Sequence, residues 1–349
     1  MKATYQKHVL QFKRLSGTSR GVLKTKDTYF IVIHDSNKKG VGECGLLRGL
    51  SIDDVPEYEE KLQWVCNNIH LGKEILYTEL THFPSIQIGI ETAFMSLQRD
   101  TPFSIFPSEF SKGNTAININ GLIWMGDKSF MKEQIAQKLS EGFSCIKMKI
   151  GAIDFKTEID LLQSIRSEFS ASEIELRVDA NGAFTPNDAL EKLQLLSELE
   201  LHSIEQPIKQ GQWQEMAALC EQTPLPIALD EELIGVFSLS EKQKLLETIQ
   251  PQYIILKPSL IGGFKGSDEW ISLAQKQNIG WWITSALESN VGLNAISQYT
   301  FTKNVKLPQG LGTGSLYTNN ISSPLRISNG TLLYDTNLSW ETNLIKDLN

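Results

Sequence analysis

Three acidic residues, Asp179, Glu205 and Asp230, each follow a short apolar run and stand about 25 residues apart. In a chain that alternates strand and helix, this spacing puts them at the carboxyl ends of consecutive parallel strands. Three neighbouring carboxylates repel one another, and a hard divalent cation with oxygen ligands removes that repulsion. Ion pairs or helix caps would explain any single acid, but three in register favour a metal site. Because no His or Cys is among them, we expect Mg²⁺.

Three lysines accompany these acids. Lys147 and Lys149 share one face of a predicted strand, since strand side chains alternate with a period of two, and Lys257 ends a later strand. A lysine is a poor base at an ordinary pKa of about 10.4, but a second ammonium nearby and partial burial both favour the neutral amine. Lys149 is therefore a candidate proton acceptor, with Lys257 facing it across the cavity.

A cation beside such a base has a recognisable chemical use. The cation binds a substrate carboxylate and stabilises the enediolate that forms when the α-proton leaves. The expected ligand is therefore a small molecule that carries a carboxylate.

The elements that must position these side chains follow two patterns. Residues 5–43 alternate as in an antiparallel meander, and helical spacing follows over residues 52–69 and 86–98. From residue 116 onward a strand, a loop and an amphipathic helix repeat. Strands are expected over residues 116–123, 145–150, 175–178, 203–205, 227–229, 253–256, 280–284 and 307–312, and helices over 127–140, 155–169, 186–199 and 213–222. The repeat predicts an α/β fold, a (β/α)8-type TIM barrel with an N-terminal α+β capping domain.

The two patterns also predict a division into domains. We expect residues 1–105 to form the capping domain and residues 115–324 the barrel, with residues 325–349 returning to the capping domain. Residues 17–27 form either a mobile loop that closes over the substrate or a plain exposed hairpin. Arg48 and Leu50 lie in a second candidate capping loop.

Composition excludes several classes of protein. A formal charge of -8 without a basic run argues against nucleic acid as a partner. No segment approaches the roughly 18 uninterrupted apolar residues of a membrane span. The four cysteines show no CxxC pairing and are expected to be buried thiols, which fits a cytoplasmic protein. The oligomeric state stays open.

In combination, these motifs resemble the muconate-lactonizing enzyme subgroup of the enolase superfamily. Within it the chain is most similar to the o-succinylbenzoate synthases of menaquinone biosynthesis. The motifs are KMK at 147–149, RVDAN at 177–181, DE at 230–231 and KP at 257–258, within a likeness that runs from Gly40 to Gly314.

The resemblance implies a role for each matching residue. Asp179, Glu205 and Asp230 would bind Mg²⁺, and Lys149 would remove the proton α to the carboxylate. Lys257 would stabilise the enediolate from the opposite face, and Lys147 would tune Lys149. Further substrate or supporting residues are expected at Arg177, Asn181, Glu231, Ser285, Gly312 and Thr313, with Glu231 as a partner of Lys257 and Ser285 near the succinyl portion of the substrate.

The implied reaction is syn elimination of water from 2-succinyl-6-hydroxy-2,4-cyclohexadiene-1-carboxylate, which gives 2-succinylbenzoate. An alternative on the same scaffold is an N-acylamino acid racemase or dipeptide epimerase that uses both lysines for 1,1-proton transfer. Dipeptide epimerases typically carry an Asp-x-Asp at the eighth strand, where this chain has Gly312 to Ser315, which disfavours an ammonium substrate.

Two further alternatives stay open. A non-catalytic barrel that only binds a small carboxylate would not need the opposed lysines. The glycines of residues 310–314 either shape the substrate cavity or cradle a phosphate.

Overall fold

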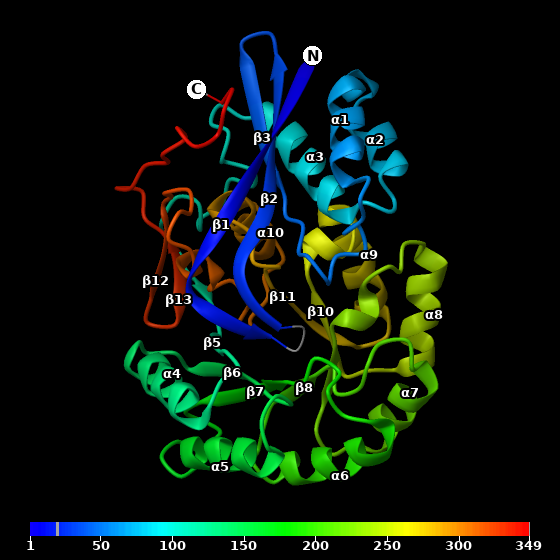
Figure 1. Ribbon diagram of the computed structural model, residues 1–349, viewed down its shortest axis with the longest axis vertical. Helices are drawn as coiled ribbons and strands as arrows, with labels where there is room; N and C mark the ends of the chain where they lie inside the picture. The colour runs from blue at the N-terminus through cyan, green and yellow to red at the C-terminus, as the bar shows by residue number, and fades with distance from the viewer. Residues whose placement is uncertain (19–20, 349) are drawn as a thin grey trace.

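The N-terminal region pairs an antiparallel sheet with a group of helices (Figure 1). The computed structural model describes residues 1–18 and 21–348, with the backbone alone for residues 15–18. The sheet consists of β1 (Lys2–Thr18), β2 (Gly21–Asp35) and β3 (Lys38–Cys44), and the helices are α1 (Tyr58–Asn67), α2 (Lys73–Glu79) and α3 (Pro84–Leu97). This is the α+β arrangement that the alternating and helical patterns predict.

The two faces of β2 are buried against different partners. Tyr29, Ile31 and Ile33 pack in a core with side chains of α1 and α3. Phe30 and Val32 point the other way and pack with Val291 and with residues of the C-terminal tail. The capping sheet is therefore held between its own helices and the remainder of the chain.

The predicted closing loop at residues 17–27 is a hairpin of β1 and β2, paired from Thr18 and Gly21 outward. Residues 19 and 20 of that prediction lie outside the described part of the chain. Leu23 of the hairpin packs with Trp124 and Leu287, which come from the parallel-sheet region. The hairpin therefore reaches the region where the candidate lysines lie.

The second region is a curled parallel sheet surrounded by helices, a mixed α/β architecture (Figure 1). Its strands, in both spatial and chain order, are β5 (Gly121–Ile123), β6 (Cys145–Lys149), β7 (Glu175–Asp179), β8 (Ser203–Glu205), β9 (Ile227–Leu229), β10 (Tyr253–Leu256) and β11 (Gly280–Ile283). Sequential parallel pairing brings the carboxyl ends of these strands to one edge, as the repeat predicts.

The helices that follow the strands begin where local sequence signals place them. They are α4 (Lys128–Ser140), α5 (Phe155–Arg166), α6 (Pro186–Ser197), α7 (Trp213–Gln222), α8 (Leu239–Ile249), α9 (Gly263–Lys276) and α10 (Asn290–Thr302). Asp127 accepts a hydrogen bond from the backbone N–H of Phe130 at the start of α4. Pro186 opens α6, where its missing N–H costs no hydrogen bond.

The segment 307–312 does not form the predicted eighth strand among the described residues. Gln309 makes a single parallel bridge with Ile119, and Gly310 makes one with Thr284. Pro308 has no N–H to donate to a neighbouring strand, and its carbonyl accepts a hydrogen bond from Arg177 at 3.0 Å. The segment therefore connects the residues after β11 to those before β5 through these two bridges and through the backbone hydrogen bonds around them, without forming a strand.

The predicted first strand, residues 116–123, is divided between two sheets. Its second half is β5, whereas its first half, β4 (Ile117–Asn118), joins β12 (Leu325–Ser328) and β13 (Thr331–Tyr334) in a separate sheet. Beyond that sheet the tail reaches the N-terminal strands, where Asp347 accepts from Thr4 and Leu344 from Gln6.

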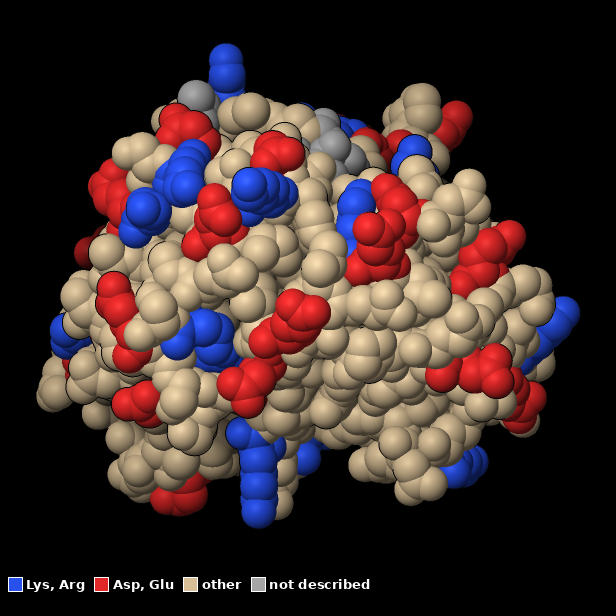
Figure 2. Space-filling model, turned by 90° about the horizontal axis from the view of Figure 1, so that it is seen from below, with Lys and Arg blue, Asp and Glu red and all other residues tan. Residues whose placement is uncertain are grey.

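The four cysteines agree with the prediction of buried thiols. All four cysteines are buried and carry free thiols. In the described part of the chain, no helix is long and apolar enough to span a bilayer. On the face that Figure 2 shows, acidic and basic side chains are interspersed, and the described residues there form no continuous basic area.

Candidate active site

The predicted acids and lysines stand together at the carboxyl edge of the parallel sheet. In the register of β6, β7 and β8, Lys149 lies opposite Asp179, and Asp179 lies opposite Glu205. Asp230 follows β9 directly, and Lys257 follows β10. Strand order alone therefore brings residues from five segments into one cluster.

The contacts within this cluster link each acid to a lysine. Asp179 Oδ2 lies 2.9 Å from both Lys147 Nζ and Lys149 Nζ. Lys147 also donates to Glu205, and Lys257 donates to Asp230. Lys257 Nζ lies 3.9 Å from the remaining oxygen of Glu205, so that acid stands between the two sides of the cluster.

The carboxylates are buried, yet their pKa values move in opposite directions. Burial alone would raise the pKa of Asp179, but Lys147, Lys149 and Lys257 hold it well below its ordinary value. Burial raises the pKa of Glu205 well above its ordinary value, and the neighbouring Asp179 adds to this shift. At Glu205 the neighbouring lysines therefore do not offset the combined effect of burial and of the nearby negative charge.

Two of the lysines are held in the charged form. Burial lowers the pKa of Lys147, but Asp179 and Glu205 outweigh burial and raise it above its ordinary value. Asp230 likewise outweighs burial at Lys257 and raises the pKa of that lysine above its ordinary value. These two side chains are fixed positive charges beside the cavity.

The donor set suits a hard divalent cation. All three acids offer oxygen atoms only, and Glu205 Oε1 is buried without a hydrogen bond from any described residue. Among the described residues, no group of three His, Cys, Asp or Glu side chains is already arranged around a metal position. Each of the three carboxylates is instead turned toward a lysine. The chemistry of the donors fits Mg²⁺, whereas their orientation is that of an ion-pair cluster.

Asn181 and Glu231 extend the cluster outward. Asn181 Oδ1 accepts from Lys149 Nζ at 2.7 Å, and its amide nitrogen donates to Glu231 at 3.0 Å. Asn181 has a φ of 44°, in the left-handed region that asparagine tolerates better than most residues. Glu231 acts on Lys257 through its charge, in the direction that raises the pKa of that lysine. Asn181 therefore links Lys149 to Glu231.

Arg177, predicted as a supporting residue, makes its contacts with Glu175, Trp282 and Pro308. Its Nε lies 2.7 Å from Glu175, and its guanidinium stacks 4.3 Å from the centre of the Trp282 ring. Together with the bond to Pro308, these contacts place it below the acids, on the side away from the strand ends. Its bond to Pro308 links the segment around residue 308 to β7.

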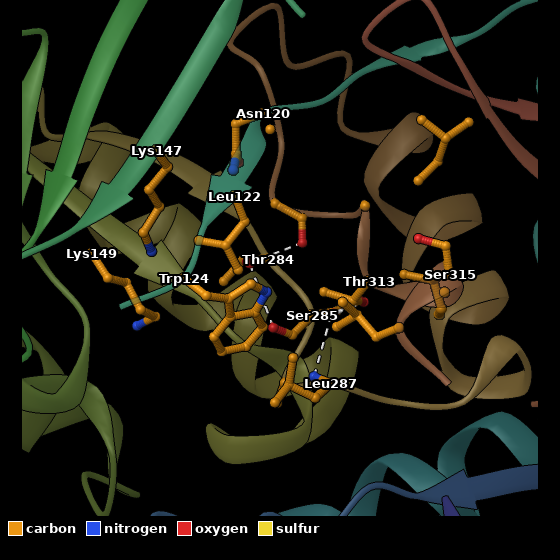
Figure 3. Close-up of a pocket in the computed structure, with 18 of the residues that line it drawn as sticks. Asn120, Leu122, Trp124, Lys147, Lys149, Thr284, Ser285, Leu287, Thr313 and Ser315 are labelled. Carbon is orange, nitrogen blue, oxygen red and sulfur yellow. Dashed lines mark hydrogen bonds between the residues drawn. The ribbon is translucent and has the colours of Figure 1, made fainter. Parts of the chain in front are cut away.

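A cavity of about 940 Å³ opens above the cluster. Lys147 and Lys149 lie on one side of it, and Ser285, Thr313 and Ser315 lie across from them (Figure 3). Lys257 also lines the cavity. Ser285 and Thr313 share a hydrogen bond between their hydroxyls. The remaining lining includes Gly312, Arg48, Leu50, Leu122, Trp124 and Leu287.

The sequence reasoning missed three contributors to the site. Asn120 and Trp124 line the cavity, and strand alternation from Leu122 could have found them, because the three share one face. Gln206 is buried and accepts from the backbone N–H of Asp230 at 3.1 Å, which helps to orient that acid. No motif signals Gln206, because its partner is 24 residues away.

Comparison with known proteins agrees with this geometry. Residues 131–337 match the family of enolase C-terminal domain-like proteins. The chain is 45% identical to o-succinylbenzoate synthase from Desulfotalea psychrophila, over 95% of this chain and 98% of that protein. The crystal structure of MenC from the same organism superimposes with a TM-score of 0.85 at 42% identity, covering 95% of this chain and 99% of that one.

A more distant structure shares the fold. The L-Ala-D/L-Glu epimerase from Bacillus subtilis superimposes with a TM-score of 0.82 at 17% identity, covering 98% of this chain and 97% of that one. The family match spans more than half of the chain, and it includes the strands that carry the acids and lysines. This chain belongs to the enolase superfamily.

Proposed function

We propose that this chain catalyses the o-succinylbenzoate synthase reaction of menaquinone biosynthesis. The reaction is syn dehydration of 2-succinyl-6-hydroxy-2,4-cyclohexadiene-1-carboxylate to 2-succinylbenzoate. The observation that carries the proposal is the 45% identity, over 95% of the chain, to a relative with that name. The lysine and carboxylate cluster supplies the groups that such a reaction needs.

Substrate binding would begin at the cluster. The ring carboxylate would lie beside Lys147, whose ammonium is held in the charged form by Asp179 and Glu205. Asp179, Glu205 and Asp230 would hold Mg²⁺, which supplies further positive charge next to that carboxylate when it is bound. Leu122, Trp124 and Leu287 would surround the ring and exclude water.

Proton transfer would belong to Lys149. In a syn elimination the proton and the hydroxyl leave from one face, so a single group on that face can accept the proton and return it to the departing hydroxyl. Lys149 Nζ is oriented by Asp179 and Asn181. Lys257 would stabilise the enediolate from the other side, since Asp230 keeps it positively charged.

The proposal extends to the architecture. The bridges of Gln309 and Gly310 support a sheet closed as a (β/α)8 barrel, with residues 115–324 as its domain. Residues 1–105 would form the capping domain, which residues 325–349 rejoin. The substrate is a small carboxylate, and the buried free thiols favour the cytoplasm as the place of action.

Racemisation or epimerisation is the second candidate, and one observation favours it. Lys149 and Lys257 approach the acids from different strands, as two-base proton transfer requires. Against it, the cavity wall at residues 312–315 offers no carboxylate for a substrate ammonium.

One assay separates the two reactions. Purified chain is incubated with the cyclohexadiene substrate, with and without Mg²⁺, and formation of the aromatic product is followed by absorbance. In parallel, an N-acylamino acid and a dipeptide are incubated in D₂O and examined for deuterium at the α-carbon. Dehydration without exchange supports the synthase, whereas exchange with inversion and no dehydration would reverse the assignment.

A further inference from the structure

The buried lysine of the capping sheet has no role in the reaction described above. Lys26 lies on β2, and its side chain is only 3% exposed. Its Nζ donates no hydrogen bond to any described residue. A buried ammonium without a direct partner is costly, so packing alone does not explain its presence.

Glu43 of β3 is one of two buried acids that act on this ammonium. It accepts from the backbone N–H groups of Ser289 and Gly292, each at 2.8 Å, at the start of α10. It also accepts from Thr28, its neighbour on β2. Through Glu43 the capping sheet caps a helix of the other region.

Glu288 is the second acid, and it joins two loops at the edge of the cavity. It accepts from the hydroxyl of Ser259, which lies two residues after Lys257. It also accepts from the backbone N–H of Ala286 at 2.7 Å, directly after Ser285. The loop that follows β10 and the loop that follows β11 are therefore tied to one carboxylate.

The seam that contains both acids has no spare room. A Cβ at Gly292 would lie 2.9 Å from Glu43 Oε2 and 2.9 Å from Glu288 Cβ. A Cβ at Gly45 would lie 3.0 Å from Glu288 Cγ and 3.1 Å from Ser259 Oγ. Glycine at these two positions therefore lets the backbone pass close to both acids, where any other residue would clash.

The charges in the seam depend on one another. Burial lowers the pKa of Lys26, and Glu43 and Glu288 oppose that shift. Burial raises the pKa of Glu288, and Lys26 opposes it in turn. Lys26 is thus a counterion that two buried carboxylates share at a distance.

We propose that Lys26 is a positioning residue for the reaction. Its ammonium balances Glu43 and Glu288, and thereby holds the two loops that carry Lys257 and Ser285 in the arrangement that the cavity requires. The kinetic part of this inference rests on the proposed function, whereas the structural part does not.

The test replaces Lys26 by methionine, which keeps the length of the side chain and removes its charge. The matched control is Lys242→Met on α8, because Lys242 is about as buried as Lys26 but pairs with Glu269, and neither of these two residues lines the cavity. We expect K26M to lower kcat/KM by about 10–100-fold through misplaced groups, and K242M to leave kcat/KM unchanged. K26R, which keeps the positive charge, should retain most of the activity.

A second readout needs no substrate. Hydrogen–deuterium exchange of peptides covering residues 257–262 and 284–292 should speed up by about tenfold or more in K26M and stay unchanged in K242M. Wild-type kcat/KM together with wild-type exchange in K26M would overturn the inference. Equal loss in K26M and K26R would also overturn it, since space and not charge would then be decisive.

If K26M does not fold, Lys26→Gln replaces it, because a neutral polar side chain is better tolerated in a polar seam. Failure of both variants to fold would assign Lys26 to stability alone and end the proposal. A wild-type chain that neither dehydrates the substrate nor binds 2-succinylbenzoate would remove the proposed function. The exchange comparison would still decide the role of Lys26.

Discussion

Asp179 at the strand ends and Glu91 on α3 are both buried acids, but their surroundings differ. Asp179 faces lysines, which hold its pKa well below the ordinary value. Glu91 accepts the backbone N–H groups of Phe264 and Lys265 at the start of α9, and burial raises its pKa to about 7. At Asp179 the lysine charges outweigh desolvation, whereas at Glu91 the two backbone N–H groups do not. The acids at the strand ends are paired with charged side chains, whereas Glu91 fastens two parts of the fold together.

The largest effect should come from the strand-end cluster. Lys149→Met removes the proposed proton acceptor, and we expect kcat to fall by about 10²–10⁴-fold. Steady-state kinetics with the cyclohexadiene substrate measures the change. Lys192→Met on the outer helix α6 is the control and should be fully active. Undiminished turnover in K149M would exclude Lys149 as the base.

Asp230→Asn should act on the cation. Loss of a charged oxygen donor should weaken the affinity for Mg²⁺, and so raise the Mg²⁺ concentration needed for activity, by more than the roughly 10–100-fold that outer contacts typically contribute. Titration of activity against Mg²⁺ and calorimetry of the metal alone measure it. Asp188→Asn, at the exposed start of α6, is the control. An unchanged Mg²⁺ titration would show that Asp230 is not a ligand.

Replacement of Glu91 should change how the stability of the fold depends on pH. An acid whose pKa is raised in the folded state holds its proton more tightly there than in the unfolded chain. The stability from Glu91 is therefore present below its ordinary value of 4.5 and lost as pH rises toward 7. Between pH 4.5 and pH 7 the free energy of unfolding should fall by about 2–3 kcal/mol less in Glu91→Gln than in the wild type. Unfolding by urea at several pH values measures it, with exposed Glu74→Gln as control, and parallel wild-type and E91Q curves would contradict it.

The smallest effect is expected on the loop-built wall. Ser285→Ala removes the hydroxyl bonded to Thr313, a neutral hydrogen bond worth about 0.5–1.5 kcal/mol. We expect KM to rise severalfold with little change in kcat, because the wall positions the substrate and takes no part in proton transfer. A fall in kcat with unchanged KM would place Ser285 in the chemistry instead.

Much of the parallel-sheet region could be predicted from local patterns. Strands β8, β9 and β10 and helix α7 lie at the predicted residues, since apolar runs and cap residues act over a few positions. The convergence of the three acids followed from the same repeat. These features need no knowledge of distant contacts.

The features that could not be predicted depend on residues far apart in the chain. Arg177 bonds to Pro308 across 131 positions, and Glu43 reaches Ser289 across 246. The first predicted strand is divided because its first half, β4, pairs with β13, which lies more than 200 residues later in the chain. Local sequence patterns cannot predict such partners, because each of the two segments on its own has the pattern of an ordinary strand or loop.

The volume of the cavity, about 940 Å³, has a consequence for the evolution of substrate specificity. Ligand pockets commonly range from about 300 to 1,000 Å³, so this one is near the generous end. Substitutions in the loops that follow β11 can reshape it to admit bulkier carboxylic acids while the lysines stay in place. A laboratory selection for new acids should therefore accumulate its changes in these loops and spare β6 to β10.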